Sequence, residues 1–297
     1  MVLPGAAQQP ETTVFRGGVA LVKTDVQATR RGRNLADLEA ADFRVYDDGA
    51  PQKIAWFGRE SQPRDLVLLL DVSGSMSASL QELASTARSA LGALHRGDRV
   101  AVILFARHST VREPFTGDFA EVQQEIRYAV EERWLGSGTA IYAAILKAAG
   151  YLASARPQAR RAVLIVTDNL SLNYQVTGDD VLRALSAADA VLNAILIGKQ
   201  KHPDVPKPGH YVNPDFIPSD VFKLAEQTGG EAVEARRAAE WFQPMIERIR
   251  ARYGIQYEAP PSPPGAFHRI RVELAPDALK RHPHAVIRAR AGYYAAR

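Results

Sequence analysis

The chain has 297 residues, of which 46% are hydrophobic and 24% are charged. This length favours two compact domains, and the composition is that of a folded globular protein rather than a disordered one. Cysteine is absent, which excludes disulfide scaffolds, thiolate zinc sites and cysteine nucleophiles. No uninterrupted apolar stretch reaches about 18 residues, so the sequence predicts no membrane-spanning helix.

The formal net charge is +4, and the positive excess lies toward the end of the chain. Residues 236–297 contain twelve Arg and Lys against five Asp and Glu. Such a skew gives weak attraction to polyanions. Specific nucleic-acid binding would need a recognition motif or a basic stripe interleaved with stacking aromatic side chains, and the sequence has neither. We therefore expect a solvated sheet face here and no nucleic-acid partner.

The first residues, Met1–Pro10, are too short for a signal peptide and lack its positive region. The small residues Gly5-Ala6-Ala7 nevertheless resemble the end of such a peptide. We therefore expect residues 1–13 to be flexible or the remnant of a signal peptide, and the protein to be exported to the periplasm or cell surface. A flexible N-terminus on a cytoplasmic protein is the alternative.

Short strand patterns predict β-structure at both ends of the chain. Apolar and polar residues alternate through the first flank, as in strands with one buried face, and Asp48-Gly49 predicts a hairpin turn. Residues 267–274 alternate in the same way, and residues 286–291 predict a final strand. Neither flank has enough strands to form a core alone. We therefore expect residues 14–62 and 253–297 to pair into one small β-sandwich.

The middle of the chain, residues 63–252, alternates apolar strands with amphipathic helices. Continuous apolar runs, typical of strands covered on both faces, occur at residues 66–71, 99–105, 162–168 and 191–197. Apolar residues at helical spacing separate these runs, with Asp118 and Ser219-Asp220 as expected helix starts and Gly229-Gly230 as an expected end. This order predicts an α/β fold with a doubly wound, mostly parallel sheet.

Oxygen-bearing side chains follow these predicted strands at their carboxyl ends, where open α/β sheets bind ligands. Asp71, Ser73 and Ser75 end the first buried strand in a turn that contains glycine. Thr139 precedes a helix after a Gly-Ser-Gly turn, and Asp168 ends the third strand. Carboxylate and hydroxyl oxygens suit hard cations such as Mg²⁺, and Mn²⁺ or Ca²⁺ less selectively.

This set of residues resembles the metal-ion-dependent adhesion site of the von Willebrand factor type A domain. The D-x-S-x-S pattern at Asp71, Ser73 and Ser75, together with Thr139 and Asp168, matches all five positions of that site. The resemblance covers about residues 66–252. One position differs, because the family usually has glycine after the last aspartate and this chain has Asn169. We expect the Asn169 side chain to reshape that loop.

The resemblance implies how the site works. In type A domains the serines and the threonine contact the metal directly, and one or both aspartates often act through water. One coordination position is left for solvent or for the carboxylate of an Asp or Glu from a partner protein. In relatives, rearrangement at the site can be coupled to a shift of the last helix, which here bears Trp241 and Ile249. A similar switch in this chain is a hypothesis.

The flanks resemble a narrower group. The segments 42–49, 51–54 and 224–230, with Gly292-Tyr293, are similar to a bacterial family of type A domain proteins common in Acidobacteria. Members of that family typically carry export signals, in agreement with the interpretation of Gly5-Ala6-Ala7. This resemblance implies an architecture and names no ligand.

Enzymatic alternatives fit the motif poorly. Asp71 alone would be read as a carboxylate that caps a turn. Ser73 as a hydrolase nucleophile would need G-x-S-x-G, whereas the sequence reads VSGSM. A phosphoryl-accepting Asp71 would need an acidic residue two positions later, where Ser73 stands. No positioned general base accompanies the hydroxyls, so we expect a protein that is not an enzyme.

Three functional classes stay open. The leading one is a divalent-cation-dependent protein-binding module. The second is a structural scaffold subunit of an envelope assembly, in which the metal stabilises the loops. A third, intracellular class resembles the type A subunits that partner ring-shaped ATPases in metal insertion. The proline-rich loop at residues 199–217 is either a partner contact or a loose insertion, and His282-Pro-His284 is expected in an exposed turn.

Overall fold

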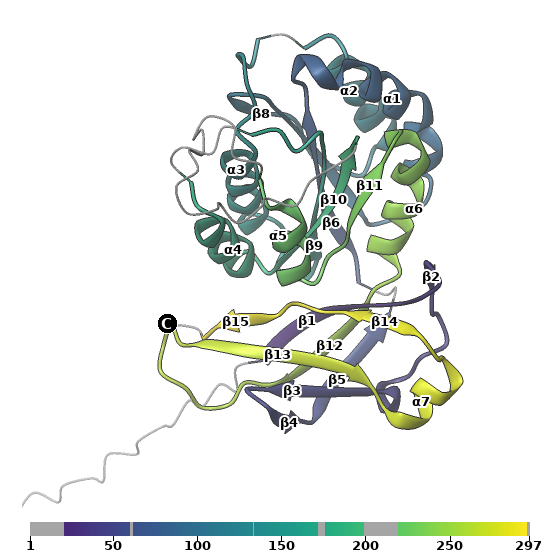
Figure 1. Ribbon diagram of the computed structural model, residues 1–297, viewed down its shortest axis with the longest axis vertical. Coiled ribbons are helices and arrows are strands. Elements are labelled where there is room, and N and C mark those ends of the chain that lie inside the picture. The colour runs from purple at the N-terminus through teal and green to yellow at the C-terminus, as the bar shows by residue number, and fades with distance from the viewer. Residues whose placement is uncertain (1–20, 60–61, 133, 172–175, 199–218, 296–297) are drawn as a thin grey trace, which may run out of the picture.

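The computed structural model describes residues 21–59, 62–132, 134–171, 176–198 and 219–295 (Figure 1). An α/β unit, defined here as residues 64–250, lies above a terminal unit of strands from both ends of the chain, residues 21–59 and 253–295. The predicted domain boundaries at 62/63 and 252/253 stay a prediction. No helix in the described ranges is both long and apolar enough to cross a membrane.

The α/β unit is built on a six-stranded sheet in the order β11-β10-β9-β6-β7-β8. Every neighbouring pair is parallel except β7 and β8, which are antiparallel. The central strand β6 is buried along its whole length, as its continuous apolar sequence predicts. The strands are β6 (Arg64–Asp71), β7 (Arg99–Phe105), β8 (Ser109–Thr116), β9 (Arg160–Thr167), β10 (Ala190–Ile197) and β11 (Ala232–Ala235).

Helices cover both faces of this sheet. One core packs the side of β6 that carries Leu66, Leu68 and Leu70 against α1, α2 and α6. The other core packs the side with Val67 and Leu69 against α3, α4 and α5. The predicted doubly wound α/β fold is confirmed. The helices are α1 (Ser77–Leu91), α2 (Phe119–Ala129), α3 (Ile141–Ala153), α4 (Gly178–Ala187), α5 (Val221–Gln227) and α6 (Ala238–Arg250).

The predicted helix ends are confirmed by their capping contacts. The Asp118 side chain accepts a hydrogen bond from the Ala120 amide (2.9 Å) at the start of α2. Asp220 accepts one from the Lys223 amide (3.0 Å) at the start of α5. Gly229, with φ of +78°, follows α5 in the left-handed conformation that commonly ends helices.

Strands from the two flanks pair with each other in the terminal unit. One sheet has the order β14-β1-β12-β5, with β2 beside β1, and the other has the order β15-β13-β3-β4. Their apolar faces share a separate core that includes Val26, Phe43, Tyr253 and Ile270. The strands are β1 (Leu21–Arg30), β2 (Arg33–Asn34), β3 (Phe43–Asp47), β4 (Ala50–Gln52), β5 (Ile54–Arg59), β12 (Tyr253–Glu258), β13 (Phe267–Leu274), β14 (Ala285–Arg288) and β15 (Gly292–Tyr294).

The predicted β3–β4 hairpin is confirmed, with Asp48 and Gly49 at φ of +46° and +84°. A strand is present where residues 286–291 predict one, but it ends earlier and is not the last strand. β14 covers Ala285–Arg288, and β15 (Gly292–Tyr294) follows in the other sheet. Gly292, the first residue of β15, is packed so closely that a Cβ there would clash with the His268 carbonyl oxygen.

A short helix α7 (Pro276–Arg281) was not predicted, and it changes the surroundings of the last two histidines. His284 is exposed, as expected. His282 is buried at the end of α7, where its Nε2 atom lies 3.3 Å from the Asp37 carboxylate, so the prediction of an exposed turn is wrong for this residue.

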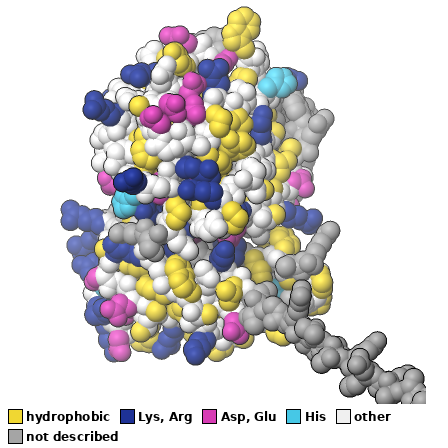
Figure 2. All heavy atoms as spheres, turned by 180° about the vertical axis from the view of Figure 1, so that it is seen from behind, with side chains coloured by type: hydrophobic (Ala, Val, Ile, Leu, Met, Phe, Trp, Pro, Cys, Tyr) yellow, Lys and Arg dark blue, Asp and Glu magenta, His cyan; other side chains and the backbone are white. Residues whose placement is uncertain are grey.

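On the face seen in Figure 2, Lys and Arg side chains of the lower half lie among hydrophobic and acidic ones.

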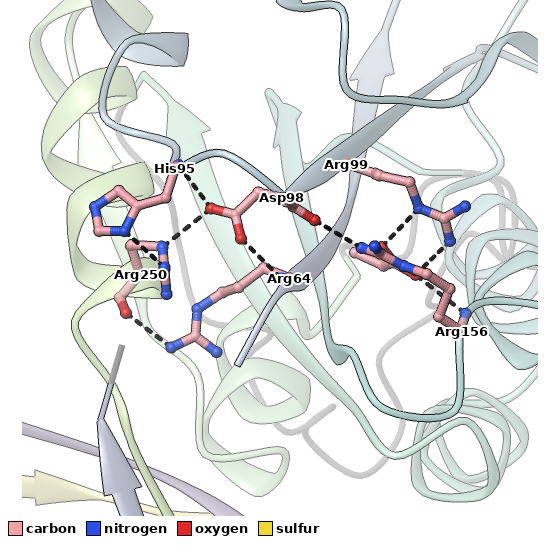
Figure 3. Close-up of polar contacts among 8 residues, drawn as sticks. Arg64, His95, Asp98, Arg99, Arg156 and Arg250 are labelled. Atoms are coloured by element: carbon pink, nitrogen blue, oxygen red, sulfur yellow. Dashed lines mark hydrogen bonds and ion pairs between the residues drawn. The ribbon is translucent and has the colours of Figure 1, made fainter. Parts of the chain in front are cut away.

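Buried carboxylates fix the edge of the α/β sheet that faces the terminal unit (Figure 3). Asp98 accepts hydrogen bonds from the amides of Arg64 (2.8 Å) and His95 (2.9 Å) and pairs with Arg250 at the end of α6 (3.0 Å). The Arg64 guanidinium donates to the Arg250 carbonyl (2.7 Å). Burial lowers the pKa of Arg64 to about 9, so this side chain is still protonated at neutral pH.

A second carboxylate acts in the same way beside this cluster. Asp65 is fully buried and pairs with Arg99 (2.7 Å) and Arg156 (2.6 Å). These hydrogen bonds outweigh the opposing effect of burial and lower the pKa of Asp65. The first two residues of β6, Arg64 and Asp65, are therefore both held in place by charged side chains.

Candidate metal centre

The five predicted site residues come from three loops at one edge of the α/β sheet. Asp71 is the last residue of β6, and Ser73 and Ser75 lie in the turn between β6 and α1. Thr139 lies two residues before α3, and Asp168 follows β9 directly. Because β6 and β9 are parallel neighbours, the loops after them meet at the same edge.

Four of these residues are joined by direct contacts. The Ser75 hydroxyl donates to the Asp168 carboxylate (2.6 Å), and the Ser73 and Ser75 hydroxyl oxygens lie 3.3 Å apart. The Ser73 amide donates to Asp71 Oδ1 (2.9 Å). The turn after β6 therefore connects both carboxylates, although they lie 97 positions apart in the chain, from 71 to 168.

Thr139 is held at the same edge through its own loop. The Ala140 amide donates to the Ala106 carbonyl after β7 (2.9 Å). The Ile141 amide donates to the Ser171 hydroxyl (3.2 Å), three residues beyond Asp168. Thr139 itself is buried. These bonds fix the Thr139 loop between the loops that follow β7 and β9.

Asp71 is an unusual carboxyl group because it is completely buried. Burial raises its pKa to about 6, and the nearby Asp168 carboxylate adds to this effect. Hydrogen bonds from the Thr167 hydroxyl (2.6 Å) and from Ser73 act in the opposite direction. A metal-free Asp71 is thus a desolvated anion at neutral pH, next to a second anion.

The residues fit a hard divalent cation. The donor set consists of two carboxylates and three hydroxyls, all oxygen ligands. A cation between Asp71 and Asp168 would offset both effects that raise the pKa of Asp71, the loss of hydration and the repulsion by Asp168. The site can therefore provide both the ligand chemistry and the electrostatic reason for binding an ion.

Asn169 shows why this position usually holds glycine. Its φ is +60°, in the left-handed region that asparagine tolerates better than most residues. Its backbone N–H donates to the Thr167 hydroxyl (3.1 Å), the same hydroxyl that donates to Asp71. The side chain is 1% exposed, and its oxygen and nitrogen have no hydrogen-bond partner in the described structure. The expected reshaping of the loop stays a prediction.

Thr167 and Ser171 are supporting residues that the sequence analysis missed. Thr167 orients Asp71, and Ser171 connects the Asp168 loop to the Thr139 loop. The only sequence signal is a hydroxyl residue directly before Asp168 and another shortly after it. Such residues are too common at strand ends to be selected without the fold.

Two large hydrophobic side chains are exposed on loops that carry site residues. Trp134, in the segment before Thr139, is 91% exposed, and Leu170, two residues after Asp168, is 65% exposed. The exposure of Trp134 is unusual, since tryptophan is mostly buried in folded proteins. The loops around the centre therefore present apolar surface as well as oxygen ligands.

A second group of possible ligands lies in the terminal unit. The ligand atoms of Asp47, Asp48 and His268 lie within 4.8 Å of one another. Asp47 already accepts hydrogen bonds from Tyr257 (2.9 Å) and Tyr293 (3.0 Å), and it contacts His268 Nδ1 at 2.8 Å. Because β3 and β12 belong to different sheets, this group ties the two sheets together. The predicted partner loop at 199–217 lies outside the described residues.

Part of the α/β unit matches a known protein family. Residues 66–170 match the sequence profile of the von Willebrand factor type A domain. Proximal thread matrix protein 1 from the mussel byssus, solved with a zinc-occupied metal-ion-dependent adhesion site, superposes with a TM-score of 0.50 at 15% identity. That match covers 70% of this chain and 50% of the mussel protein.

Two bacterial structures are also similar. A von Willebrand factor type A protein from Catenulispora acidiphila covers 95% of this chain and 76% of its own, at 14% identity and a TM-score of 0.48. An aerotolerance-related membrane protein from Bacteroides fragilis covers 63% and 98%, at 20% identity and a TM-score of 0.47. Curated protein sequences give no match. The α/β unit thus has the Rossmann-like fold of the von Willebrand factor type A domain, and residues 66–170 match that family's profile.

Proposed function

We propose that this protein is a divalent-cation-dependent protein-binding module. An ion of the Mg²⁺ type, or Mn²⁺ or Ca²⁺, would be held by Asp71, Ser73, Ser75, Thr139 and Asp168. It would accept a carboxylate from an Asp or Glu of a partner protein. The observation that carries the proposal is the joining of Asp71, Ser73, Ser75 and Asp168 by direct contacts at one sheet edge.

The chain's own residues define what the ion would do. Three of the five candidate ligands are neutral hydroxyls, so the site neutralises less of the cation's charge than a site with more carboxylates would. The bound ion supplies a positive charge that attracts an anionic oxygen. The contacts among Ser73, Ser75 and Asp168 keep the hydroxyls next to the carboxylate. This arrangement supports binding rather than catalysis, and we propose that the protein is not an enzyme.

Exposed side chains beside the centre support a protein as the partner. Trp134 and Leu170 are 91% and 65% exposed. Tryptophan is enriched among the residues that dominate binding energy at protein interfaces. We therefore propose that the partner's carboxylate is accompanied by apolar side chains that pack on Trp134 and Leu170.

The first test is calorimetric titration of Mg²⁺ and Mn²⁺ into protein stripped of metal with a chelator. We expect saturable binding to the parent and none to a folded Asp71→Ala, Ser73→Ala double variant. Ser85→Ala is the matched control, because within the described residues this exposed α1 hydroxyl bonds only to the Glu82 carbonyl (2.6 Å). Absence of binding to the parent, or equal binding to the double variant, would refute the proposed centre.

The scaffold alternative has an observation of its own. Among the described residues, five of the eight exposed large hydrophobic side chains lie in the terminal unit: Leu21, Phe267, Leu279, Val286 and Tyr294. If these make the main contacts, Asp71→Ala lowers stability but leaves partner binding intact at low temperature. If the metal centre is the binding site, Asp71→Ala abolishes partner binding while the fold is retained.

Export to the periplasm or cell surface also stays our proposal. It rests on Gly5-Ala6-Ala7 and on the resemblance of the flanks to the Acidobacteria-type family. N-terminal sequencing of the protein from its natural host tests it. A mature start near Gln8 is the expected result, and an intact Met1 would count against export.

A further inference from the structure

A cavity of about 240 Å³ lies between the α/β unit and the terminal unit. It is lined by Arg160 and Ala190, at the first residues of β9 and β10, and by one face of α4. From the other side it is lined by β1, β5 and β12 and by residues 290–292. It therefore lies at the sheet edge opposite the metal centre, and cavities between domains are a common place for small-molecule sites.

Two glycines leave room for the side chain that forms the apolar wall of this cavity. Gly58 and Gly254 are paired across β5 and β12. A Cβ at Gly58 would lie 2.5 Å from Trp56 Cη2. One at Gly254 would clash first with the Arg160 guanidinium and would also lie 2.9 Å from Trp56 Cζ3. The missing side chains let the indole of Trp56 lie against the sheet and line the cavity.

Other apolar side chains surround the same space. Leu182, on the cavity-lining face of α4, contributes from the α/β unit. Phe267 and Tyr294, whose rings lie 5.1 Å apart, contribute from the terminal unit. Phe267 and Tyr294 are 51% and 41% exposed. Aromatic side chains thus line a cavity that solvent can reach.

The charges that line the cavity are balanced, with three cationic and three anionic residues. Two pairs neutralise each other, because Arg160 lies 2.9 Å from Asp25 and Arg290 lies 2.9 Å from Asp189. The other two lining charges are Lys23 on β1 and Asp179 on α4. Both residues are exposed, and neither forms an ion pair with any residue that the structure describes. A complementary ligand would offer one positive and one negative group.

We propose that this cavity binds a small zwitterion with an apolar body, an amino acid with an aromatic or large aliphatic side chain or a dipeptide of that kind. The ammonium group would pair with Asp179 and the carboxylate with Lys23, while the apolar body would pack on Trp56. The volume is slightly below the roughly 300–1,000 Å³ typical of ligand pockets, which favours a ligand of amino-acid size over a nucleotide. The metal centre plays no part in this binding.

Three probes that share one phenyl ring test the proposal. L-Phenylalanine carries both charges, phenethylamine carries only the ammonium, and 3-phenylpropionate carries only the carboxylate. The full chain has three tryptophans, so Trp134→Phe and Trp241→Phe leave Trp56 as the single indole reporter. We expect saturable fluorescence change with L-phenylalanine and about tenfold weaker binding of each analogue, because each loses one charge-assisted hydrogen bond.

Two variants assign the charges. Lys23→Gln should remove the advantage of L-phenylalanine over phenethylamine, and Asp179→Asn should remove its advantage over 3-phenylpropionate. Asp277→Asn is the control, since this exposed residue lies on α7, away from the cavity lining. Equal affinity for all three probes would overturn the proposal, as would unchanged preferences in both variants. Absence of saturable binding by L-phenylalanine and by L-leucine would overturn it as well.

Discussion

Asp71 carries opposing demands within a single side chain. It is fully buried, and it accepts hydrogen bonds from Thr167 and Ser73 that favour its charged form. Burial and the neighbouring Asp168 have the larger effect and raise its pKa to about 6. Because a metal ion binds the deprotonated carboxylate, protons and metal compete for this residue.

This competition predicts how metal binding depends on pH. Above pH of about 6 a metal-free Asp71 is ionised, and metal affinity should change little with pH. Below that value each metal ion must displace a proton, so the apparent affinity should fall by up to about tenfold per pH unit. Calorimetric titrations of Mg²⁺ at pH 5, 6, 7 and 8 measure the effect. Constant affinity from pH 5 to 8 would contradict it.

Thr167→Val provides the matched test of the cause. The Thr167 hydroxyl donates to Asp71 Oδ2 at 2.6 Å and lowers the pKa of this carboxyl group. Its removal should raise that pKa further, so the loss of metal affinity should begin at a higher pH than in the parent. Ser85→Ala, on the exposed side of α1, should leave the pH profile unchanged.

The same pKa sets a stability effect with the opposite sign. The ordinary pKa of 3.8 is raised to about 6 in the folded metal-free protein. The folded state therefore favours the protonated form of Asp71. Protonated Asp71 adds to the free energy of unfolding below pH of about 4, and this contribution is lost as the pH rises to about 6. Above that range the charged, desolvated Asp71 destabilises the metal-free fold. A bound cation would offset this cost at neutral pH.

At the scale of elements, the sequence predicts best what depends on local pattern. The buried run 66–71 identifies β6 because both faces of the strand are covered, and Asp118 and Asp220 identify helix starts by a bond made within one turn. The D-x-S-x-S pattern identifies its loop because those residues are adjacent. Each feature depends on side chains a few positions apart.

Other elements depend on distant partners and could not be predicted. Residues 286–291 alternate like one strand, but β14 ends at Arg288, and β15, which follows it, pairs in a different sheet. Asp98 and Arg250 lie far apart in sequence, and no sequence pattern predicts their ion pair. The burial of His282 depends on the fold of α7. These features require the tertiary structure, because their partners lie many residues away.

The end of α6 yields a prediction at this scale. Asp98 pairs with Arg250 and also holds the amides of Arg64 and His95. Asp98→Ala would leave the buried Arg250 guanidinium without this carboxylate, so the free energy of unfolding should fall by about 3–5 kcal/mol. Urea unfolding followed by circular dichroism measures the change. The same end of α6 is the one that the hypothesised helix shift would move.

An exposed pair supplies the comparison. Asp277 and Lys280 form an ion pair at 3.0 Å, with side chains that are 91% and 78% exposed. Asp277→Ala should change the unfolding free energy little, because exposed ion pairs contribute weakly. If Asp98→Ala is as mild as Asp277→Ala, the buried carboxylate does not fix the end of α6 shown in Figure 3.

At the scale of the whole molecule, one arginine joins the two units at several points. Arg160, at the start of β9, pairs with Asp25 on β1 (2.9 Å) and donates to the carbonyls of Gly58 (3.1 Å) and Arg252 (2.9 Å). Its side chain is 8% exposed. These partners lie on β1, on β5 and directly before β12. A single residue of the α/β unit therefore contacts two strands of the terminal unit and the residue that leads into a third.

This placement predicts that Arg160 couples the unfolding of the two units. The parent should unfold in one calorimetric transition, with equal calorimetric and van't Hoff enthalpies. In Arg160→Ala, Asp25 loses its ion-pair partner and the carbonyls lose their donor, so the terminal unit should unfold first and the transition should divide into two. Arg160→Lys should restore coupling only in part, because an ammonium group lacks the planar set of donors that reaches all three partners. A single unchanged transition in Arg160→Ala would show that other contacts, such as the hydrogen bond from the Arg252 guanidinium to the Asp25 carbonyl (3.4 Å), are sufficient for cooperative folding.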